Sequence, residues 1–180
     1  MKQTIILMVV MLLPASALAA RQVDIGNLGG TLTGSASGLT VGDSTLTLVN
    51  NLYSHGIITG NLGTVAFSTA AMDSGSIETG GTFAPGGSFT VTGNGTNGVA
   101  NGPIFTGTWT SEVTWTLITQ SDGTHYYNLT GVVSGTIYTQ YRSYSASGVT
   151  FQLTVNTGTG YFNGSTILSS GNLNVLCRPY

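Results

Sequence analysis

The sequence predicts an all-β fold, and three features of the chain support this. Apolar and hydroxyl-bearing residues alternate with a period of two in several segments, which places the apolar members on one face of an extended strand. Turn-forming residues separate these segments at short intervals, and no segment after the first twenty residues sustains a helical period. Many short strands with frequent turns are typical of an antiparallel β-sandwich. We therefore expect a single sandwich of the jelly-roll or Ig-like kind.

The N-terminal segment has the features of an export signal. Lys2 precedes an apolar run over residues 5–13, and Ala17-Leu18-Ala19 provides the small residues of an Ala-x-Ala cleavage site. The run is shorter than the roughly 20 apolar residues that a spanning helix needs, and no second run follows. We expect residues 1–19 to be a signal peptide and residues 20–180 to be a single secreted β domain without a membrane span. Its location is then extracellular or in the cell envelope, which in a bacterium means the periplasm or the cell surface.

Four segments carry the clearest strand pattern. In chain order they are residues 45–48, 88–92, 113–117 and 149–155, with the sequences TLTL, SFTVT, VTWTL and VTFQLTV. Threonine suits such strands because it is β-branched and its hydroxyl can face water. The best candidate for a short helix is the segment over residues 67–72.

Glycine-containing turns connect the predicted strands. Asp122-Gly123 lies between strand patterns at residues 115–119 and 125–130, and it predicts the clearest hairpin because glycine supplies the positive φ of a tight turn. The stretch over residues 93–103 is long and poor in apolar residues, so we expect an exposed loop there.

A β-solenoid is the alternative fold, because threonine pairs of the form Thr-x-Thr recur along the chain. The pairs begin at Thr31, Thr45, Thr90, Thr106, Thr114 and Thr157. Their spacing is irregular, whereas a solenoid is built from a fixed repeat, and we therefore favour the sandwich.

The chain carries little charge. Charged residues make up 6% of the sequence, against roughly 25% in ordinary globular proteins. After the predicted signal the only basic residues are Arg21, Arg142 and Arg178. These are too few and too scattered to neutralise phosphates, which argues against nucleic acid and against anionic membrane surfaces. Hydrophobic residues make up 41% of the chain, which argues against disorder.

The sequence has one cysteine, so an intramolecular disulfide is impossible. Cys177 alternates in step with Leu173 and Val175, and we expect it to be buried as a small hydrophobic side chain. A disulfide between two chains is the alternative.

No catalytic, cofactor or metal-binding motif is found, and we expect neither an enzyme nor a cofactor or metal site. Glu78 and Glu112 could serve as the two carboxylates of a glycosidase if folding brought them together. Asp122 and His125 could form part of a hydrolase triad. Each residue also has an ordinary role at a strand edge or turn, so a hydrolase is the third hypothesis for function.

Tyrosine side chains suggest a ligand-binding surface in the C-terminal half. An extended segment over residues 134–144 would present alternate side chains on one face, beside a neighbouring strand over residues 126–130. The candidate residues are Tyr126, Asn128, Tyr138, Gln140, Arg142 and Tyr144. Tyrosine rings can stack on sugar faces while amide and guanidinium groups bind hydroxyls, which predicts carbohydrate binding. Ordinary cross-strand packing is the alternative role for these tyrosines.

The first hypothesis for function is a non-catalytic secreted or cell-envelope protein that acts as a structural or adhesive module. An exported, weakly charged β chain without catalytic motifs is typical of this class. Its expected partners are glycans or other cell-surface proteins. The second hypothesis is a carbohydrate-binding module that uses the tyrosine-bearing face.

Overall fold

The computed structural model describes residues 21–52 and 56–177, and within them every regular element is a β-strand. The strands are β1 (Arg21–Leu28), β2 (Thr31–Ser35), β3 (Gly38–Asn50), β4 (Ile57–Thr69), β5 (Met72–Ser76), β6 (Gly80–Phe83), β7 (Gly87–Asn94), β8 (Asn101–Trp109), β9 (Val113–Thr119), β10 (His125–Tyr138), β11 (Ser143–Gly158) and β12 (Ser165–Cys177). Each pairing between these strands is antiparallel. The predicted all-β, antiparallel organisation is confirmed, and the described residues contain no stacked parallel coils of a β-helix.

Two predictions concern parts of the chain outside this description. The predicted signal peptide, residues 1–19, lies outside the described residues. The backbone of Cys177 pairs with Arg21 at the end of β12. The side chain of Cys177 is outside the described part, so its burial stays a prediction.

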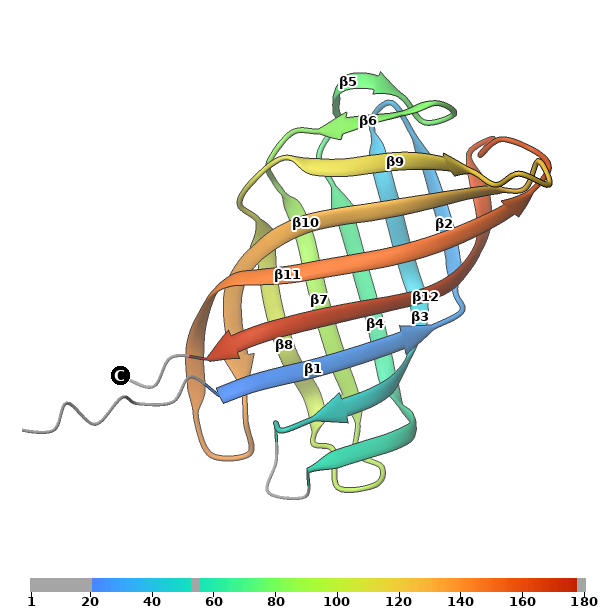
Figure 1. The fold of residues 1–180 in the computed structure, drawn as a ribbon. Helices are drawn as coiled ribbons and strands as arrows, with labels where there is room; N and C mark the ends of the chain where they lie inside the picture. The colour runs from blue at the N-terminus through green and yellow to red at the C-terminus, as the bar shows by residue number, and fades with distance from the viewer. Residues whose placement is uncertain (1–20, 53–55, 178–180) are drawn as a thin grey trace, which may run out of the picture.

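The twelve strands form one continuous sheet whose pairings return to the starting strand. From β1 the path runs through β12, β11, β10, β8, β7, β4 and β3, and β3 pairs again with β1. β2 pairs with β12 and β3, and β9, β6 and β5 extend the sheet from β10. Figure 1 shows two layers, with β1 and β9–β12 crossing in front of β3, β4, β7 and β8. Strands that bend from one layer into the other join layers that cross steeply.

Strand β10 is one of these bent strands. Its residues 125–130 pair with β9 and its residues 133–137 pair with β8, while β11 follows both parts. A register shift just before Gly135 marks the bend, as bulges do in twisted sheets. Gly131 permits close packing at this point, because a Cβ there would lie 2.8 Å from the ring of Trp109. The absence of a side chain on Gly131 therefore lets the bend close on the core.

Alternation sorts the side chains of β11 as the sequence predicts. The buried residues of this strand include Val149, Phe151, Leu153 and Val155. Thr150 and Gln152, which lie between them, are exposed. The ring of Phe151 meets the ring of Phe89 edge to face, with centroids 4.8 Å apart, and Trp109 contacts both rings. Aromatic pairs that connect the two layers thus make up the centre of the core.

The candidate segment for a short helix, residues 67–72, is not helical. Strand β4 continues to Thr69, and β5 begins at Met72. Phe67 pairs in register with Phe89 on β7, and both rings are buried. Burial of Phe67 in the sheet core therefore overrides the weak local pattern.

The loop prediction and the hairpin prediction have different outcomes. The expected loop over residues 93–103 is shorter in the structure, because β7 continues to Asn94 and β8 begins at Asn101. The hairpin at Asp122-Gly123 is confirmed: Gly123 has a φ of 82°, and the Gln120 N–H donates to the Thr124 carbonyl over 2.8 Å.

Candidate functional site

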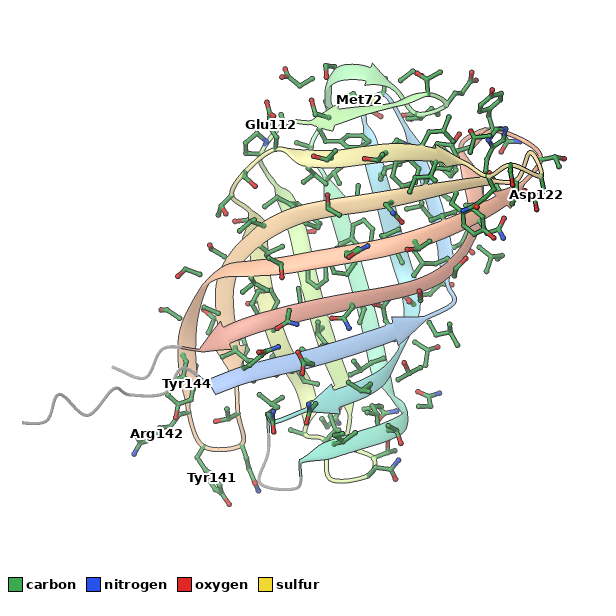
Figure 2. The ribbon with its side chains drawn as sticks, viewed as in Figure 1. Met72, Glu112, Asp122, Tyr141, Arg142 and Tyr144 are labelled. Carbon is green, nitrogen blue, oxygen red and sulfur yellow. The ribbon has the colours of Figure 1, made fainter. Side chains whose placement is uncertain are left out.

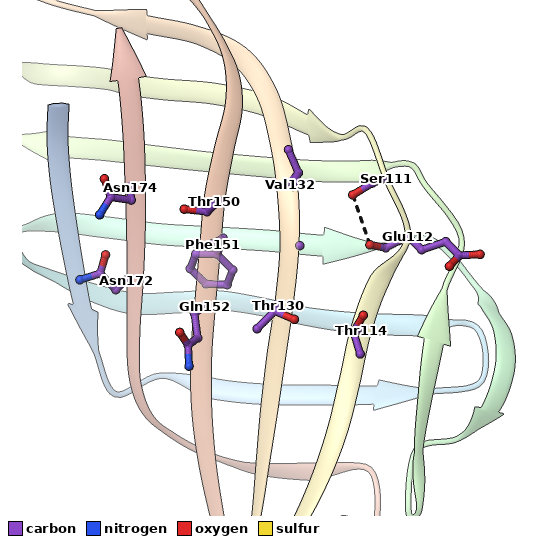
Figure 3. Close-up of a pocket in the computed structure, with 11 residues that line it drawn as sticks. Ser111, Glu112, Thr114, Thr130, Val132, Thr150, Phe151, Gln152, Asn172 and Asn174 are labelled. Atoms are coloured by element: carbon purple, nitrogen blue, oxygen red, sulfur yellow. Dashed lines mark hydrogen bonds between the residues drawn. The ribbon is translucent and has the colours of Figure 1, made fainter. Parts of the chain in front are cut away.

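A groove of about 660 Å³ crosses the outer face of β9, β10, β11 and β12 (Figure 3). Its lining consists of Ser111, Glu112, Thr114, Thr130, Gly131, Val132, Thr150, Phe151, Gln152, Asn172 and Asn174. Small-molecule sites in proteins have volumes of about 300–1,000 Å³. The groove is therefore large enough for a ligand of that size.

The sheet register arranges the outward side chains of the groove in two rows. Thr114, Thr130, Gln152 and Asn172 are consecutive partners on the four strands, and we call them the open row. Val132, Thr150 and Asn174 form a second row on three of the strands. Neighbouring strands lie about 4.8 Å apart, so hydroxyl and amide groups recur at that interval across the groove.

The four side chains of the open row make no hydrogen bond to any other described residue. The adjacent row on the same strands is different, because the Thr154 hydroxyl donates to Asn128 Oδ1 over 2.9 Å. We call Asn128 and Thr154 the closed pair. Both sets lie on one outer face; the closed pair is joined by an internal hydrogen bond, whereas the open row leaves its hydrogen-bonding groups to solvent or a ligand.

The lining of the groove includes one charged residue, Glu112, whose carboxylate points away from the other lining residues in Figure 3. Glu112 lies in the connection between β8 and β9, at one end of the groove (Figures 2 and 3). The Ser111 hydroxyl donates to the Glu112 carbonyl over 3.3 Å, and the Thr110 N–H donates to the Val132 carbonyl over 2.9 Å. The second of these bonds holds the connection against β10. No lysine or arginine lines the groove.

The predicted tyrosine site does not form as one surface. Tyr126 and Asn128 lie near the start of β10, and Tyr138 is its last residue. The twelve residue steps from Tyr126 to Tyr138 measure up to roughly 40 Å along the strand, so the two groups are too far apart to share a small ligand. Figure 2 shows the same separation, with Arg142 at one end of the molecule and Asp122, in the turn before β10, at the other.

The remaining residues of the predicted site belong to a turn and to the next strand. The Thr139 N–H donates to the Arg142 carbonyl over 2.8 Å, so the chain reverses at Gln140 instead of continuing extended. Tyr138 pairs with Ser143, and Tyr144 pairs with the buried Ile137. Tyr138 and Tyr144 therefore lie on opposite faces of the sheet.

The two tyrosines also have different contacts. The hydroxyls of Tyr138 and Thr106 are hydrogen-bonded at 3.3 Å, whereas Tyr144 is partly buried and packs against the hydrophobic core. Cross-strand packing, the alternative role from the sequence, describes both contacts. The shared face failed as a prediction because residues 139–142 carry no glycine–asparagine turn signal.

Glu78 and Glu112 are not brought together. Phe83 pairs with Val113 and Gly81 pairs with Trp115, so the β5–β6 turn that holds Glu78 points toward the far end of β9. Glu112 precedes the near end of the same strand. The two carboxylates therefore lie at opposite ends of β9.

Asp122 and His125 also have separate partners. The Thr124 N–H donates to Asp122 Oδ1 over 2.9 Å, and this bond lowers the pKa of the exposed carboxyl. His125 Nδ1 is 3.0 Å from the Thr119 hydroxyl, and its ring stacks on Tyr161 with centroids 4.4 Å apart. Each residue thus serves the hairpin and its surroundings.

One buried polar group was not singled out from the sequence. The Tyr127 hydroxyl donates to the Glu78 carbonyl over 2.6 Å and accepts the Phe162 N–H over 3.0 Å. Its ring stacks on Trp115 at a centroid distance of 4.8 Å. Burial raises the pKa of Tyr127 above its ordinary value. The hydroxyl links β10 to two connections, the β5–β6 turn and the β11–β12 loop, and it is not exposed to a ligand.

The described residues include no cluster of three or more His, Cys, Asp or Glu side chains suited to a metal ion. In this part of the chain no helix has the length and apolar content to cross a bilayer. Comparison of the chain with protein-family models, curated protein sequences and solved structures finds no match. The function must therefore be inferred from the residues of the chain.

The groove was missed at the sequence level for a physical reason. The outward positions Gln152, Asn172 and Asn174 can be read from the alternation of their strands. Their neighbours cannot, because a loop separates β11 from β12 and β10 has two partners on its other side. The sequence shows that these positions are polar, but it does not show the strand pairing that brings them together.

Proposed function

We propose that this chain is an exported, non-catalytic structural or adhesive protein that contacts its partners through the outer face of β9–β12. The observation that carries the proposal is the open row, whose four uncharged polar side chains have no partner within the described protein. Unpaired hydroxyl and amide groups on an ordered surface favour contacts made by hydrogen bonding.

The N-terminal sequence and the composition support export. A basic start, an apolar run and a small-residue cleavage site predict a signal peptide over residues 1–19, and the location is then extracellular or the cell envelope. The two crossing layers agree with a sandwich in the broad sense, and the jelly-roll or Ig-like subdivision stays a prediction.

Association through sheet edges is disfavoured by the topology. The pairings of the main strands close on themselves, and β5 ends the remaining path as a strand of five residues. Asp73 is exposed on β5, and the Met72 N–H already donates to the Ala36 carbonyl over 2.8 Å. Short and charged edges resist the addition of another strand. Contacts through a sheet face are therefore favoured over edge-to-edge polymerisation.

An adhesion assay with matched charge variants tests this proposal. The exported product of the full-length gene is purified, its N-terminus is sequenced, and its retention on cells of the producing organism is measured. We expect cleavage after Ala19 and retention that Gln152→Lys abolishes, because the new charge lies in the groove. Thr64→Lys is the control, since Thr64 is exposed on β4 in the other layer. An uncleaved product, or equal retention of both variants, would overturn the proposal.

A further inference from the structure

We propose that the groove on β9–β12 is a binding site for a neutral oligosaccharide. This inference rests on the proposed function and names the class of ligand for the same face. It differs from the site predicted from the sequence, because its hydrogen-bonding groups come from the open row and not from tyrosines.

The hydrogen-bonding groups of the open row match those of a sugar. The amides of Gln152 and Asn172 each carry two N–H donors and an acceptor oxygen, and the hydroxyls of Thr114 and Thr130 both donate and accept. Sugar hydroxyls also donate and accept, so each contact can be satisfied in either direction. Because these four side chains have no partner among the described residues, binding breaks no internal hydrogen bond.

The charge of the groove selects a neutral ligand. Glu112 is the only charged residue in the lining, and no cation is present to hold a phosphate, sulfate or carboxylate. The Glu112 carboxylate points away from the other lining residues (Figure 3), so it places a negative charge at the end of the groove, which disfavours an anionic ligand.

The shape of the groove favours a chain of sugars over a single ring. The open row crosses four strands, and three steps of about 4.8 Å give a length of roughly 14 Å. Val132 is half-buried in the lining and supplies an apolar contact for the C–H face of a sugar. Gly131 and Phe151 lie between the polar rows at the floor of the groove.

A peptide added as an extra strand would need free backbone groups. The groove lies in the middle of the sheet, where β10 and β11 already pair on both sides. Peptides that bind by strand addition occupy exposed sheet edges. The observations thus favour a ligand that is recognised by side chains.

Wild-type protein is tested first on an array of neutral oligosaccharides of glucose, galactose, mannose and N-acetylglucosamine, with sialylated and sulfated glycans beside them. The best neutral binder is then titrated into the ¹⁵N-labelled protein. We expect amide shifts to concentrate on residues 114, 130, 152 and 172 and to be small at the Tyr138–Arg142 turn. This mapping uses the unaltered chain, so it does not depend on a variant that folds.

Two double variants then test the assignment by calorimetric titration. Gln152→Ala with Asn172→Ala removes both amides, and we expect affinity to fall by about tenfold or more. Thr116→Ala with Ser170→Ala is the matched control, because both residues are exposed on β9 and β12 one row outside the groove. We expect the control to bind as the wild type does.

The result that would overturn the inference is an array without a neutral binder, a preference for sulfated or sialylated glycans, or equal affinity for the two double variants. Shifts confined to the tyrosines would also overturn it. If cells retain the protein while no neutral oligosaccharide binds, the inference fails and the proposed function stands. If cells do not retain the protein and no neutral oligosaccharide binds, both the inference and the proposed function fail.

Discussion

The closed pair and the open row lie on the same outer face, two residues apart along the same strands. In the closed pair the Thr154 hydroxyl donates to Asn128, so each residue satisfies the other. In the open row Gln152 and Asn172 are register partners without a side-chain hydrogen bond. Similar polar residues thus contribute differently: the closed pair contributes to the stability of the sheet, and the open row is available to a ligand.

The largest expected effect concerns Phe151, which precedes Gln152 on β11 and points to the opposite face. Phe151→Ala should lower the free energy of unfolding by about 3–5 kcal/mol, because it removes a ring that packs on Phe89 and Trp109 and leaves a cavity. Urea denaturation followed by tryptophan fluorescence measures this change. A loss below about 1 kcal/mol would show that the two faces of β11 are not divided as described.

The next effect concerns Tyr127, whose hydroxyl has hydrogen-bond partners within the protein, as the closed pair does, but inside the core. Tyr127→Phe should cost about 1–3 kcal/mol of unfolding free energy, since the Phe162 N–H loses its acceptor and the Glu78 carbonyl loses its donor. The same denaturation experiment checks it. Unchanged stability would mean that water replaces the hydroxyl at both partners.

Tyr127 also predicts a dependence of stability on alkaline pH. Burial raises its pKa in the folded state, whereas the unfolded chain ionises at about pH 10. Its contribution to stability is therefore complete below about pH 10 and is lost as the pH rises toward the folded-state pKa. Denaturation at a series of pH values should show a steeper alkaline loss for wild type than for Tyr127→Phe. Parallel curves would contradict this assignment.

A smaller effect is expected at the closed pair itself. Asn128→Ala and Thr154→Ala should each cost about 1 kcal/mol, and the double variant should cost less than the sum because both changes remove one hydrogen bond. A double-mutant cycle measures this coupling free energy. Strict additivity would indicate that the bond contributes nothing to the folded state.

The smallest effect on stability is expected in the open row. Gln152→Ala and Asn172→Ala should each change the free energy of unfolding by no more than about 0.5 kcal/mol, since both residues are exposed and neither has a partner to lose. Thermal unfolding of the two variants checks it. A loss near 2 kcal/mol would place these amides among the structural contacts.

The sequence predicted much of the fold because alternation is a local signal. Val149, Phe151 and Leu153 turned inward as expected, and the Asp122-Gly123 hairpin formed where its turn residues lie. The candidate helical segment over residues 67–72 instead forms the end of β4 and the start of β5, since the pairing of Phe67 with Phe89 depends on β7, a later strand. The local pattern thus identified strands and turns. Pairing with strands that are distant in the sequence determined the structure where the local pattern was weak.

The candidate site depends on the non-local part of the structure. The bend of β10 gives one strand two partners, β9 and β8. Tyr126 and Tyr138 lie near opposite ends of β10, whereas Gln152 and Asn172 are register partners on β11 and β12. The sequence of β10 does not indicate that this strand pairs with both β8 and β9. Glu112 was singled out for catalysis with Glu78, and the sheet instead places it at the end of the groove.

The most direct test measures stability and oligosaccharide affinity together in two double variants. Gln152→Ala with Asn172→Ala should keep the unfolding free energy of the wild type and lose affinity, whereas Asn128→Ala with Thr154→Ala should lose stability and keep affinity. Denaturation and titration calorimetry on the same preparations give both quantities. This division of roles is contradicted if both double variants lose stability, or if both lose affinity.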